Sequence, residues 1–359
     1  MKESLQQTIE RFDPDLGLER ASTPPASWYR DESIAALEAE AVFAGSWQLV
    51  ARRDQLQSSG AFVTAELAGE PIVVVRDGEE IRGFYNVCRH HAAQVATDPC
   101  GTVRALHCPY HGWTYNLDGT LRNAPQFDGA MAMGGAEFNL QPVRVEQWYD
   151  WVFVCLNPTA VPLATQLGDL QLPFDPTALQ HDRRVSYELN CNWKVFVDNY
   201  LDGGYHVPYL HRELNGALDG NAYRIDVGNR HCIQSCPTSS EASSAGAVRS
   251  GTAWYLWLYP NLMVNFYEGL MDLNLVLPAG PERCIVHFDY YFADQDAAFR
   301  DESIRVADRV QAEDVAICEA VQRGLRSRSY DTGRLSPLKE GGERRFHQLL
   351  HGDLKNALA

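Results

Sequence analysis

Two short motifs, each combining one cysteine with one histidine, constrain the fold of this chain more than any other feature. The first is Cys88-Arg89-His90, and the second, seventeen residues further on, is Cys108-Pro109-Tyr110-His111-Gly112-Trp113. Together they offer two thiolates and two imidazoles. This ligand set is typical of a Rieske [2Fe–2S] cluster, in which two cysteines bind one iron and two histidines bind the other. The sequence therefore predicts a cluster held by Cys88, His90, Cys108 and His111.

A structural zinc site is the alternative for these four ligands. Zinc sites usually combine C-x₂₋₄-C pairs with H-x₃₋₅-H pairs, so that each pair contains one residue type. Here each motif is mixed, and the first has a single intervening residue, which favours the iron–sulfur cluster. The runs 72–75 and 81–87 are strand-like and flank an Asp77-Gly78 turn. We therefore expect short β-strands to hold the two ligand loops.

Length and composition indicate an ordinary globular chain of two domains. The 359 residues are 45% hydrophobic and 22% charged. We expect a segment at 1–44 that packs on the second domain, a cluster domain at 45–155 and a second domain at 156–359. No apolar run reaches the roughly 18 residues needed to span a bilayer. The polar start of the chain has no signal core, which predicts a cytoplasmic protein.

Charge and cysteine content exclude two further classes. A net charge of −16 argues against nucleic acid as a partner, because phosphate binding needs clustered lysine and arginine. Nine cysteines are an odd number in a chain without an export signal, so disulfides are not expected. The seven cysteines outside the cluster motifs are predicted to be reduced core residues.

Potential metal ligands also recur later in the chain. Asp198, Asp202 and His206 follow one another at intervals of four, which places them on one face of a predicted helix. His206 and His211 are five apart, and we expect Pro208 to end or bend the helix so that both reach one metal. Two imidazoles need a carboxylate to complete the 2-His-1-carboxylate face that binds Fe(II) and leaves positions open for O₂.

A long predicted helix at about 297–325 supplies the carboxylate. Its apolar residues form one stripe, and Asp314 falls within it, where a bare carboxylate is costly unless it is paired or metal-bound. Glu313, at the edge of the stripe, is the second candidate. The alternative is that Asp314 forms a salt bridge and that the histidines satisfy hydrogen bonds in the core. Because the chain also carries a redox cluster, we favour an iron site of His206, His211 and Asp314.

These motifs resemble those of the α subunits of Rieske non-haem iron oxygenases, and the resemblance covers nearly the whole chain. Cys88-x-His90 with Cys108-x₂-His111 is similar to the family's cluster motif, and His206-x₄-His211 with a late helical aspartate is similar to its iron ligands. Within the family, the stretches 195–209, 21–25 and 271–278 are similar to the choline monooxygenase branch.

The resemblance implies an α+β fold. An antiparallel β Rieske domain precedes a catalytic domain of helix-grip type, in which helices cover an antiparallel sheet. It also implies a head-to-tail homotrimer that takes electrons from a ferredoxin or flavin reductase. In such a trimer, electrons pass from the cluster of one subunit through His111 and an acidic residue to the iron of the next.

The chain departs from the family pattern at two positions. Members usually carry the bridging acid three positions before the first iron histidine, which is Gly203 here. We therefore assign the bridge to Asp202, with Asp198 as the alternative. His91 stands where many members have arginine after the first cluster histidine, which alters the hydrogen bonding around the cluster.

Aromatic side chains in predicted strands are candidates for binding the substrate. The candidate residues, one acid included, are Tyr255, Trp257, Tyr259, Phe266, Tyr267 and Glu268. Alternation puts the first three on one side of a strand. Aromatic faces hold a quaternary ammonium group with roughly 0.5–2 kcal/mol per contact. The alternative is that these rings only pack in the core.

Three functions are compatible with these observations. The favoured one is an oxygenase that uses O₂ and electrons from a reductase to hydroxylate choline or a related quaternary ammonium compound. The second is the same machinery acting on another small substrate, such as an aromatic acid or an N-methyl amine. The third is a Rieske electron carrier without catalytic iron, which the length of the chain and its second ligand set disfavour.

Overall fold

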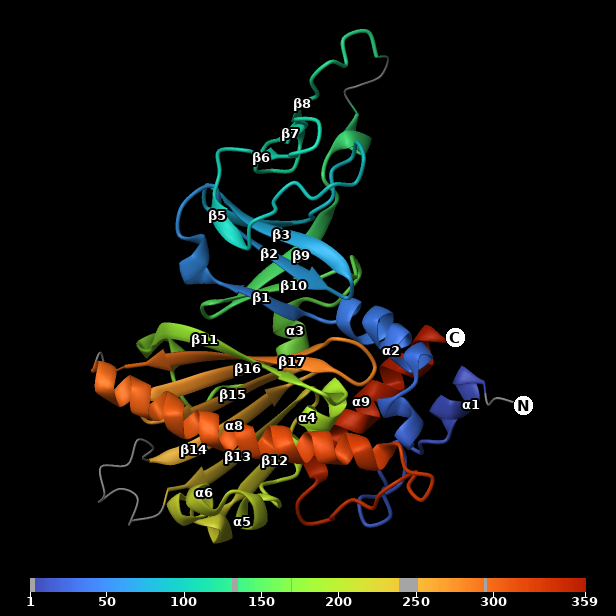
Figure 1. Cartoon of the computed structure of the whole chain (residues 1–359), viewed down its shortest axis with the longest axis vertical. Coiled ribbons are helices and arrows are strands. Elements are labelled where there is room, and N and C mark those ends of the chain that lie inside the picture. Colours follow the sequence, from blue (N-terminus) through green and yellow to red (C-terminus); the bar gives the residue numbers. More distant parts are fainter. Residues whose placement is uncertain (1–3, 131–134, 169, 239–250, 294–295) are drawn as a thin grey trace. The chain divides into compact units, whose positions relative to one another are not determined.

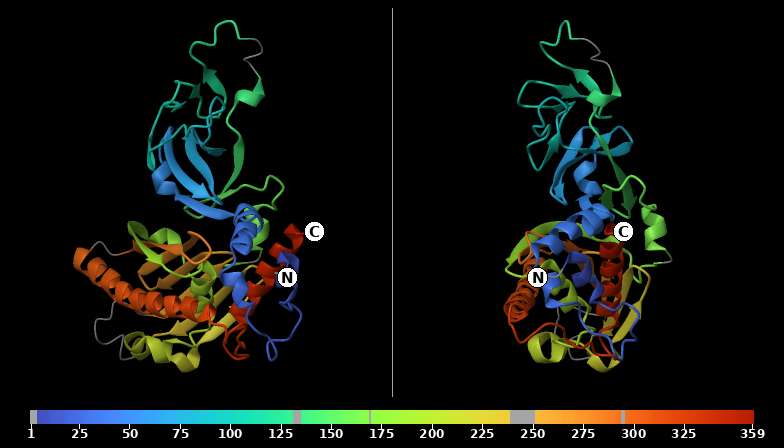
Figure 2. Two further views of the ribbon diagram at one scale, coloured as in Figure 1. Left: turned by 45° about the vertical axis from the view of Figure 1, so that its right-hand side comes forward. Right: turned by 90° about the vertical axis from the view of Figure 1, so that its right-hand side faces the viewer.

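The chain folds into two compact units, shown in a computed structural model that describes residues 4–130, 135–168, 170–238, 251–293 and 296–359. One unit comprises residues 39–166, and the other combines residues 1–38 with residues 167–359. The first is built from β-strands, whereas helices surround a single sheet in the second (Figures 1 and 2). The predicted α+β architecture, with a β domain and a sheet covered by helices, is confirmed.

Antiparallel strands form two sheets in the unit 39–166. The larger sheet has the order β1-β10-β9-β4-β3-β2-β5, and the smaller one has the order β6-β7-β8. The strands are β1 Gln48–Arg52, β2 Ala61–Leu67, β3 Glu70–Asp77, β4 Glu80–Tyr85, β5 Cys100–Thr102, β6 Leu106–His107, β7 Thr114–Tyr115, β8 Leu121–Asn123, β9 Pro142–Trp148 and β10 Trp151–Cys155. Short helical turns lie at Ala39–Ala44, Arg53–Leu56 and Ala136–Phe138.

Strand β3 is the centre of this unit because it is buried on both faces. Residues 72–75, predicted to be a strand, are no more than 1% exposed. The expected turn follows, with Gly78 at a φ of +59° that favours glycine, and leads into β4. Val73, Val75 and Phe84 pack in one core with Cys88 and Cys108, so the β scaffold is continuous with the two cysteines.

One antiparallel sheet of seven strands forms the middle of the second unit. Its order is β11-β17-β16-β15-β14-β13-β12. The strands are β11 Gln180–Leu189, β12 Arg224–Val227, β13 His231–Pro237, β14 Thr252–Leu258, β15 Leu262–Tyr267, β16 Leu270–Pro278 and β17 Cys284–Phe292. Strands β14 and β15 contain four of the aromatic residues that the sequence places in strands, Tyr255, Trp257, Phe266 and Tyr267.

Helices of both chain segments surround this sheet. They are α1 Leu5–Glu10, α2 Glu32–Glu38, α4 Trp193–Leu201, α5 Val207–Leu210, α6 Arg212–Ala217, α8 Ala297–Leu325 and α9 Gly341–Ala357, with short turns at Ala26–Tyr29, Pro176–Ala178 and Gly220–Ala222. Helix α3, Leu163–Leu167, is at the end of the unit 39–166. Helix α8 runs across one face of the sheet (Figure 1). Helix α4 contacts α8, α9 and strand β16, so it lies between the sheet and the two long helices.

Helix α8 has the predicted bounds, but the predicted apolar stripe is only partly buried. Ile317 and Val321 are 38% and 45% exposed, whereas Cys318 is buried. Gln322 is buried instead, because its side chain accepts a hydrogen bond from Asn192 N at 2.9 Å and donates one to a backbone oxygen. Helix α9 follows α8 and is missing from the sequence prediction.

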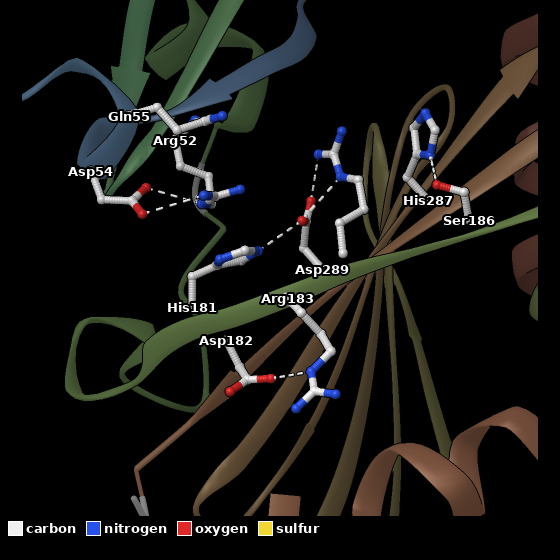
Figure 3. Close-up of polar contacts among 10 residues, drawn as sticks. Arg52, Asp54, Gln55, His181, Asp182, Arg183, Ser186, His287 and Asp289 are labelled. Carbon is white, nitrogen blue, oxygen red and sulfur yellow. Dashed lines mark hydrogen bonds and ion pairs between the residues drawn. The ribbon is translucent and has the colours of Figure 1, made fainter. Parts of the chain in front are cut away.

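The sheet also contains a buried ion pair on the face opposite Phe288. Asp289 of β17 is 1% exposed and accepts hydrogen bonds from Arg184 at 2.6 and 3.0 Å and from His181 at 3.0 Å (Figure 3). Burial alone raises the pKa of Asp289, but hydrogen bonds with His181 and Arg184 and the charge of Arg184 outweigh burial and lower this pKa to about 2. Within the described residues, no helix combines the length and apolarity that a membrane crossing requires.

Candidate active site

The four predicted cluster ligands lie on two loops of the unit 39–166. Cys88 and His90 follow β4, whereas Cys108 and His111 lie between β6 and β7. Backbone hydrogen bonds close both loops in the same way. Cys88 N donates to Ala93 O, and Cys108 N donates to Trp113 O, each at 2.8 Å. Each loop thus presents one thiol and one imidazole on a short hydrogen-bonded turn.

The side chains of these loops fit an iron–sulfur cluster. Both thiols are 2% exposed, and the rings of His90 and His111 have centroids 4.7 Å apart. His90 Nδ1 is buried and has no hydrogen-bond partner in the described structure, which suits a nitrogen that binds metal. Burial and the neighbouring imidazoles lower the pKa of His90, which keeps it in the neutral form that metals require. Tyr115 Oη lies 3.3 Å from Cys88 Sγ.

In the second unit, helix α4 ends before the first predicted iron ligand. Asp202 caps α4, and Gly203 and Gly204 then turn the chain with φ of +70° and +67°. A Cβ on the first of these glycines would lie 2.3 Å from a backbone carbonyl oxygen, so glycine is required. The predicted continuous helical face through His206 is therefore wrong. Pro208 does not end a helix either, because it lies in the first turn of α5, where proline is tolerated.

The three predicted iron ligands nevertheless converge. His206, His211 and Asp314 each offer one ligand atom, and these atoms all lie within 4.8 Å of one another. His211 Nε2 is 3.1 Å from Asp314 Oδ1, and Asn199 donates to the same oxygen at 2.9 Å. Burial by itself lowers the pKa of His211, but hydrogen bonds with Asp314 and Glu313 outweigh it and raise this pKa. A metal ion would replace the proton held between these groups.

Each histidine of this group has a carboxylate on its other ring nitrogen. Asp202 Oδ2 is 2.6 Å from His206 Nδ1, and Glu313 Oε2 is 2.6 Å from His211 Nδ1. This arrangement fixes the tautomer and orientation of metal-binding histidines, leaving Nε2 for the metal. Glu313, the second candidate for the carboxylate ligand, therefore lies on the far side of His211 from Asp314.

Asp198, the alternative bridging acid, faces elsewhere. Its carboxylate accepts a hydrogen bond from Tyr29 Oη at 2.8 Å and lies 2.9 Å from His347 Nε2. Of the two candidate acids, Asp202 alone contacts an iron-ligand candidate within the described structure. The structure thus favours Asp202 as the acid next to the iron site.

A cavity of about 120 Å³ opens beside His206, His211 and Asp314, between the sheet and helices α4 and α8. The sheet contributes one face, with Gln234, Tyr255, Asn265, Tyr267, Asp272, Asn274 and Phe288. The helices contribute Phe196, Asn199, Tyr200, Ala307, Val310 and Gln311. None of the described lining residues is a lysine or an arginine. The cavity therefore combines aromatic rings, amides and carboxylates.

Only two of the six predicted substrate residues line this cavity. Tyr255 and Tyr267 do so, and their hydroxyl groups are 2.8 Å apart. Trp257 and Tyr259 share the face of Tyr255, but both pack against Phe346 of α9, which the sequence analysis did not foresee.

The other two predicted substrate residues also lie outside the cavity. Phe266 is on the opposite face of β15 from Tyr267 and stacks on Phe174, with ring centroids 4.2 Å apart. Its position follows from the alternation of side chains along a strand. Glu268 is exposed beyond the end of β15.

Asp272 is the main cavity residue that the sequence analysis missed. It is 3% exposed and accepts hydrogen bonds at 2.7 Å from the side-chain amides of Asn265 and Asn274. A signal for it exists in the sequence: Asp272 and Asn274 are polar residues two apart in an otherwise apolar strand. Such spacing places both on one face, where a cavity accommodates them.

Comparisons with protein families define the class. Residues 46–142 match the Rieske [2Fe-2S] domain, and residues 176–352 match the catalytic domain of ring-hydroxylating alpha subunits. These matches cover the two loops with their cysteines and histidines, and the unit with the convergent histidines and aspartate. The chain therefore has a Rieske [2Fe–2S] domain and a domain that binds mononuclear iron.

Similar proteins extend the family assignment from the two matched domains to nearly the whole chain. Choline monooxygenase of Arabidopsis thaliana is 42% identical, with 98% of this chain and 87% of the relative covered. The carnitine monooxygenase oxygenase subunit of Escherichia coli K12 is 30% identical, with 92% and 94% covered. The crystal structure of the quaternary ammonium Rieske monooxygenase CntA with L-carnitine matches with a TM-score of 0.81 and 25% identity, covering 98% and 99%. The chain belongs to the Rieske non-haem iron oxygenases and is an enzyme of that family.

Proposed function

We propose that this chain is the oxygenase component of a monooxygenase whose substrate is a quaternary ammonium cation without a carboxylate, with choline as the first candidate. Its relatives are named for choline and for carnitine. These two compounds differ in charge, because carnitine carries a carboxylate and choline does not. The charges that line the cavity can therefore decide between them.

The carboxylate of Asp272 among aromatic rings is the observation that carries this proposal. Tyr255 and Tyr267 offer ring faces to a trimethylammonium group, and Asp272 adds a negative charge nearby. A substrate carboxylate would lie close to Asp272 with no cation among the described lining residues to pair with it, which is costly in a buried site. The same argument disfavours an aromatic acid as the substrate.

We assign the iron to His206, His211 and Asp314, with Asp202 and Glu313 orienting the two imidazoles. The bound iron supplies the activation of O₂. In the overall reaction, O₂, two electrons and two protons convert a substrate C–H bond to C–OH and release one water molecule. The protein positions this C–H bond beside the three ligands and excludes bulk water with the buried side chains of the cavity.

We assign the cluster to Cys88, His90, Cys108 and His111 and propose that the active form is a head-to-tail homotrimer. Within it, Asp202 connects His206 of one subunit to His111 of the partner subunit. Each of the two histidines has an exposed tyrosine near it in the sequence. Tyr110, next to His111, is 64% exposed, and Tyr209, three residues after His206, is 78% exposed. The solved structure of a quaternary ammonium Rieske monooxygenase that this chain resembles is described as giving insights into inter-subunit electron transfer in that protein. A ferredoxin or flavin reductase is the proposed electron donor.

We also propose a cytoplasmic location. All nine cysteines are unpaired in the structure, although eight of them are buried and two of these, Cys191 and Cys284, have sulfur atoms 3.8 Å apart. Unpaired thiols are typical of a reducing compartment. Fractionation of cells that express the tagged protein checks this location.

Single turnover of the chemically reduced enzyme tests the substrate without requiring its natural reductase. We expect oxidation of choline in this single turnover. In steady state, with electrons from a non-native ferredoxin and reductase, we expect kcat/KM for carnitine, γ-butyrobetaine and glycine betaine to be at least roughly tenfold lower than for choline. Asp272→Asn should raise the KM for choline roughly tenfold, because a charge-assisted contact is lost. Asp289→Asn is the matched control, since it removes a buried carboxylate from the opposite face of the same sheet. Equal use of carnitine, or an unchanged KM in Asp272→Asn, contradicts the proposal.

A further inference from the structure

A second group of histidine and carboxylate side chains is buried where helix α4 meets helix α9. Asp198 of α4 lies 2.9 Å from His347 Nε2, and Glu343 Oε1 lies 3.9 Å from the same nitrogen. Tyr29 completes the group, with its hydroxyl 2.8 Å from Asp198 Oδ2. None of these residues lines the substrate cavity, and the proposed reaction uses none of them.

The charges of this group do not balance. Glu343 is 6% exposed, and its carboxylate forms no hydrogen bond in the described structure. Lys194 is a buried cation on α4, but its ammonium group is paired with Glu38 at 2.7 Å. Two carboxylates therefore share one imidazole and one phenol. Burial, reinforced by the charge of Asp198, raises the pKa of Glu343 well above its usual range, as happens when a buried carboxylate lacks a cation.

The arrangement of donor atoms suits a metal ion. Glu343 and His347 are four residues apart on α9, so they project from one face of the helix, and Asp198 faces them from α4. One ligand atom from each of the three lies within 4.8 Å of the other two. Donor atoms on a single zinc ion are roughly 3–3.5 Å apart, because each lies about 2.0–2.2 Å from the metal. Asp198 and His347 already have roughly this spacing at 2.9 Å, and the distance of 3.9 Å between Glu343 Oε1 and His347 Nε2 would have to shorten when an ion binds.

The group is also accessible. A cavity of about 180 Å³ is lined by Tyr29, Asp198 and Glu343, and it includes exposed residues of α8 such as Val321. An ion can therefore reach the two carboxylates without unfolding of the surrounding helices. Asn199, which hydrogen-bonds Asp314, lines this cavity as well as the substrate cavity.

We propose that Asp198, Glu343 and His347 form a second divalent-cation site, suited to Zn²⁺, with Tyr29 holding the free oxygen of Asp198. A charge of +2 balances the two carboxylates, and both imidazole nitrogen and carboxylate oxygen are zinc ligands. The ion ties α9 to the helix that carries Asn199 and leads into Asp202. It is a structural ion, separate from the iron site and independent of the substrate.

Zinc binding to the holoenzyme tests this site. Enzyme with a full iron complement is equilibrated with micromolar Zn²⁺ and desalted, and zinc and iron per chain are measured by mass spectrometry. We expect about one zinc per chain with iron unchanged, and roughly tenfold less zinc in Glu343→Gln and His347→Gln. His351→Gln is the matched control, because it removes another buried histidine one helical turn further along α9 and should retain the zinc.

The outcomes separate the site from the proposed function, because no turnover is measured. Wild-type enzyme that keeps its iron and retains no zinc overturns the proposal, and this result needs no variant to fold. Equal zinc in wild type and Glu343→Gln also overturns it. Glu343→Gln is nearly isosteric and should keep about one iron per chain beyond the two of the cluster, which reports that the unit carrying the zinc site is folded.

Discussion

The two redox sites of this chain are built in opposite ways. The cluster loops take all their ligand candidates from residues 88–111, and short backbone hydrogen bonds shape each loop. The proposed iron site takes its two histidines from the two ends of the short helix α5 and its aspartate from α8, about a hundred residues later. The first site is a local structure, whereas the second exists only when the whole unit has folded.

This difference also appears in how the histidines are held. His90 stacks on Trp113 in parallel, with ring centroids 4.9 Å apart, and its Nδ1 has no protein partner in the described structure. His206 and His211 are each fixed by a carboxylate at 2.6 Å from Nδ1. Packing therefore orients an imidazole in the cluster loops, whereas charged hydrogen bonds orient the imidazoles at the iron site. Variants at the two sites can test whether each site forms independently of the other.

The largest expected effects come from removing one ligand at each site. Cys108→Ser should abolish the visible absorbance of the cluster and all activity, leaving about one iron per chain. His211→Ala should also abolish activity, but the cluster absorbance should remain, with about two irons per chain. Iron analysis together with visible and electron paramagnetic resonance spectra measures both.

The pair of variants can contradict the comparison in two ways. Substrate turnover by His211→Ala would show that this residue does not hold the catalytic iron. Loss of the cluster in His211→Ala would show that the two sites do not form independently. Tyr209→Ala, an exposed neighbour of His211, serves as the control for folding and metal content.

A smaller effect is expected from the carboxylates that orient the iron histidines. Glu313→Gln leaves His211 Nδ1 without its charged partner, and such changes cost metal sites roughly tenfold or more in affinity. The Glu313 side chain is 47% exposed, which places the effect at the low end of this range. Equilibrium dialysis against a series of Fe(II) concentrations measures it. Glu319→Gln, on the same helix but bound to Asn190, should have no effect on iron affinity.

The sequence was sufficient to predict the local site. Mixed cysteine–histidine spacing indicated a Rieske cluster, and the match to the Rieske domain confirms this class of cofactor. The flanking strands β3 and β4 and their glycine turn were predicted as well. A motif of 24 residues carries this information because its ligands and its scaffold are neighbours in sequence.

The iron site and the cavity were predicted only in part. Residue types and an apolar helix pointed to His206, His211 and Asp314, but the four-residue spacing placed His206 on helix α4, which ends at Leu201. The positive φ of two adjacent glycines redirects the chain there, and helical periodicity does not reveal it. Trp257 and Tyr259 were expected in the cavity because the alternation of side chains places them on the same face of the sheet as Tyr255. Alternation does not show which helix covers each part of that face. Helix α9 packs against Trp257 and Tyr259, so these two residues lie outside the cavity.

The last prediction concerns the stability of the unit that contains the proposed iron site. Asp289→Asn removes the charge that Arg184 and His181 stabilise, and the lowering of the Asp289 pKa from 3.8 to about 2 corresponds to about 2 kcal/mol at neutral pH. Because Asp289 lies in β17, we expect amide protection there to fall roughly thirtyfold, with β3 of the other unit unchanged. Hydrogen exchange with mass spectrometry measures both strands separately.

The pH dependence of this effect has a defined sign. The Asp289 pKa is lower in the folded chain than in the unfolded chain, so its contribution is complete above about pH 4 and disappears as the pH falls towards about 2. The difference between wild type and Asp289→Asn in β17 should therefore be largest at pH 7 and shrink below pH 4. Loss of protection in β3 as well as β17 would mean that the two units unfold together. The local site would then depend on the same long-range packing as the iron site.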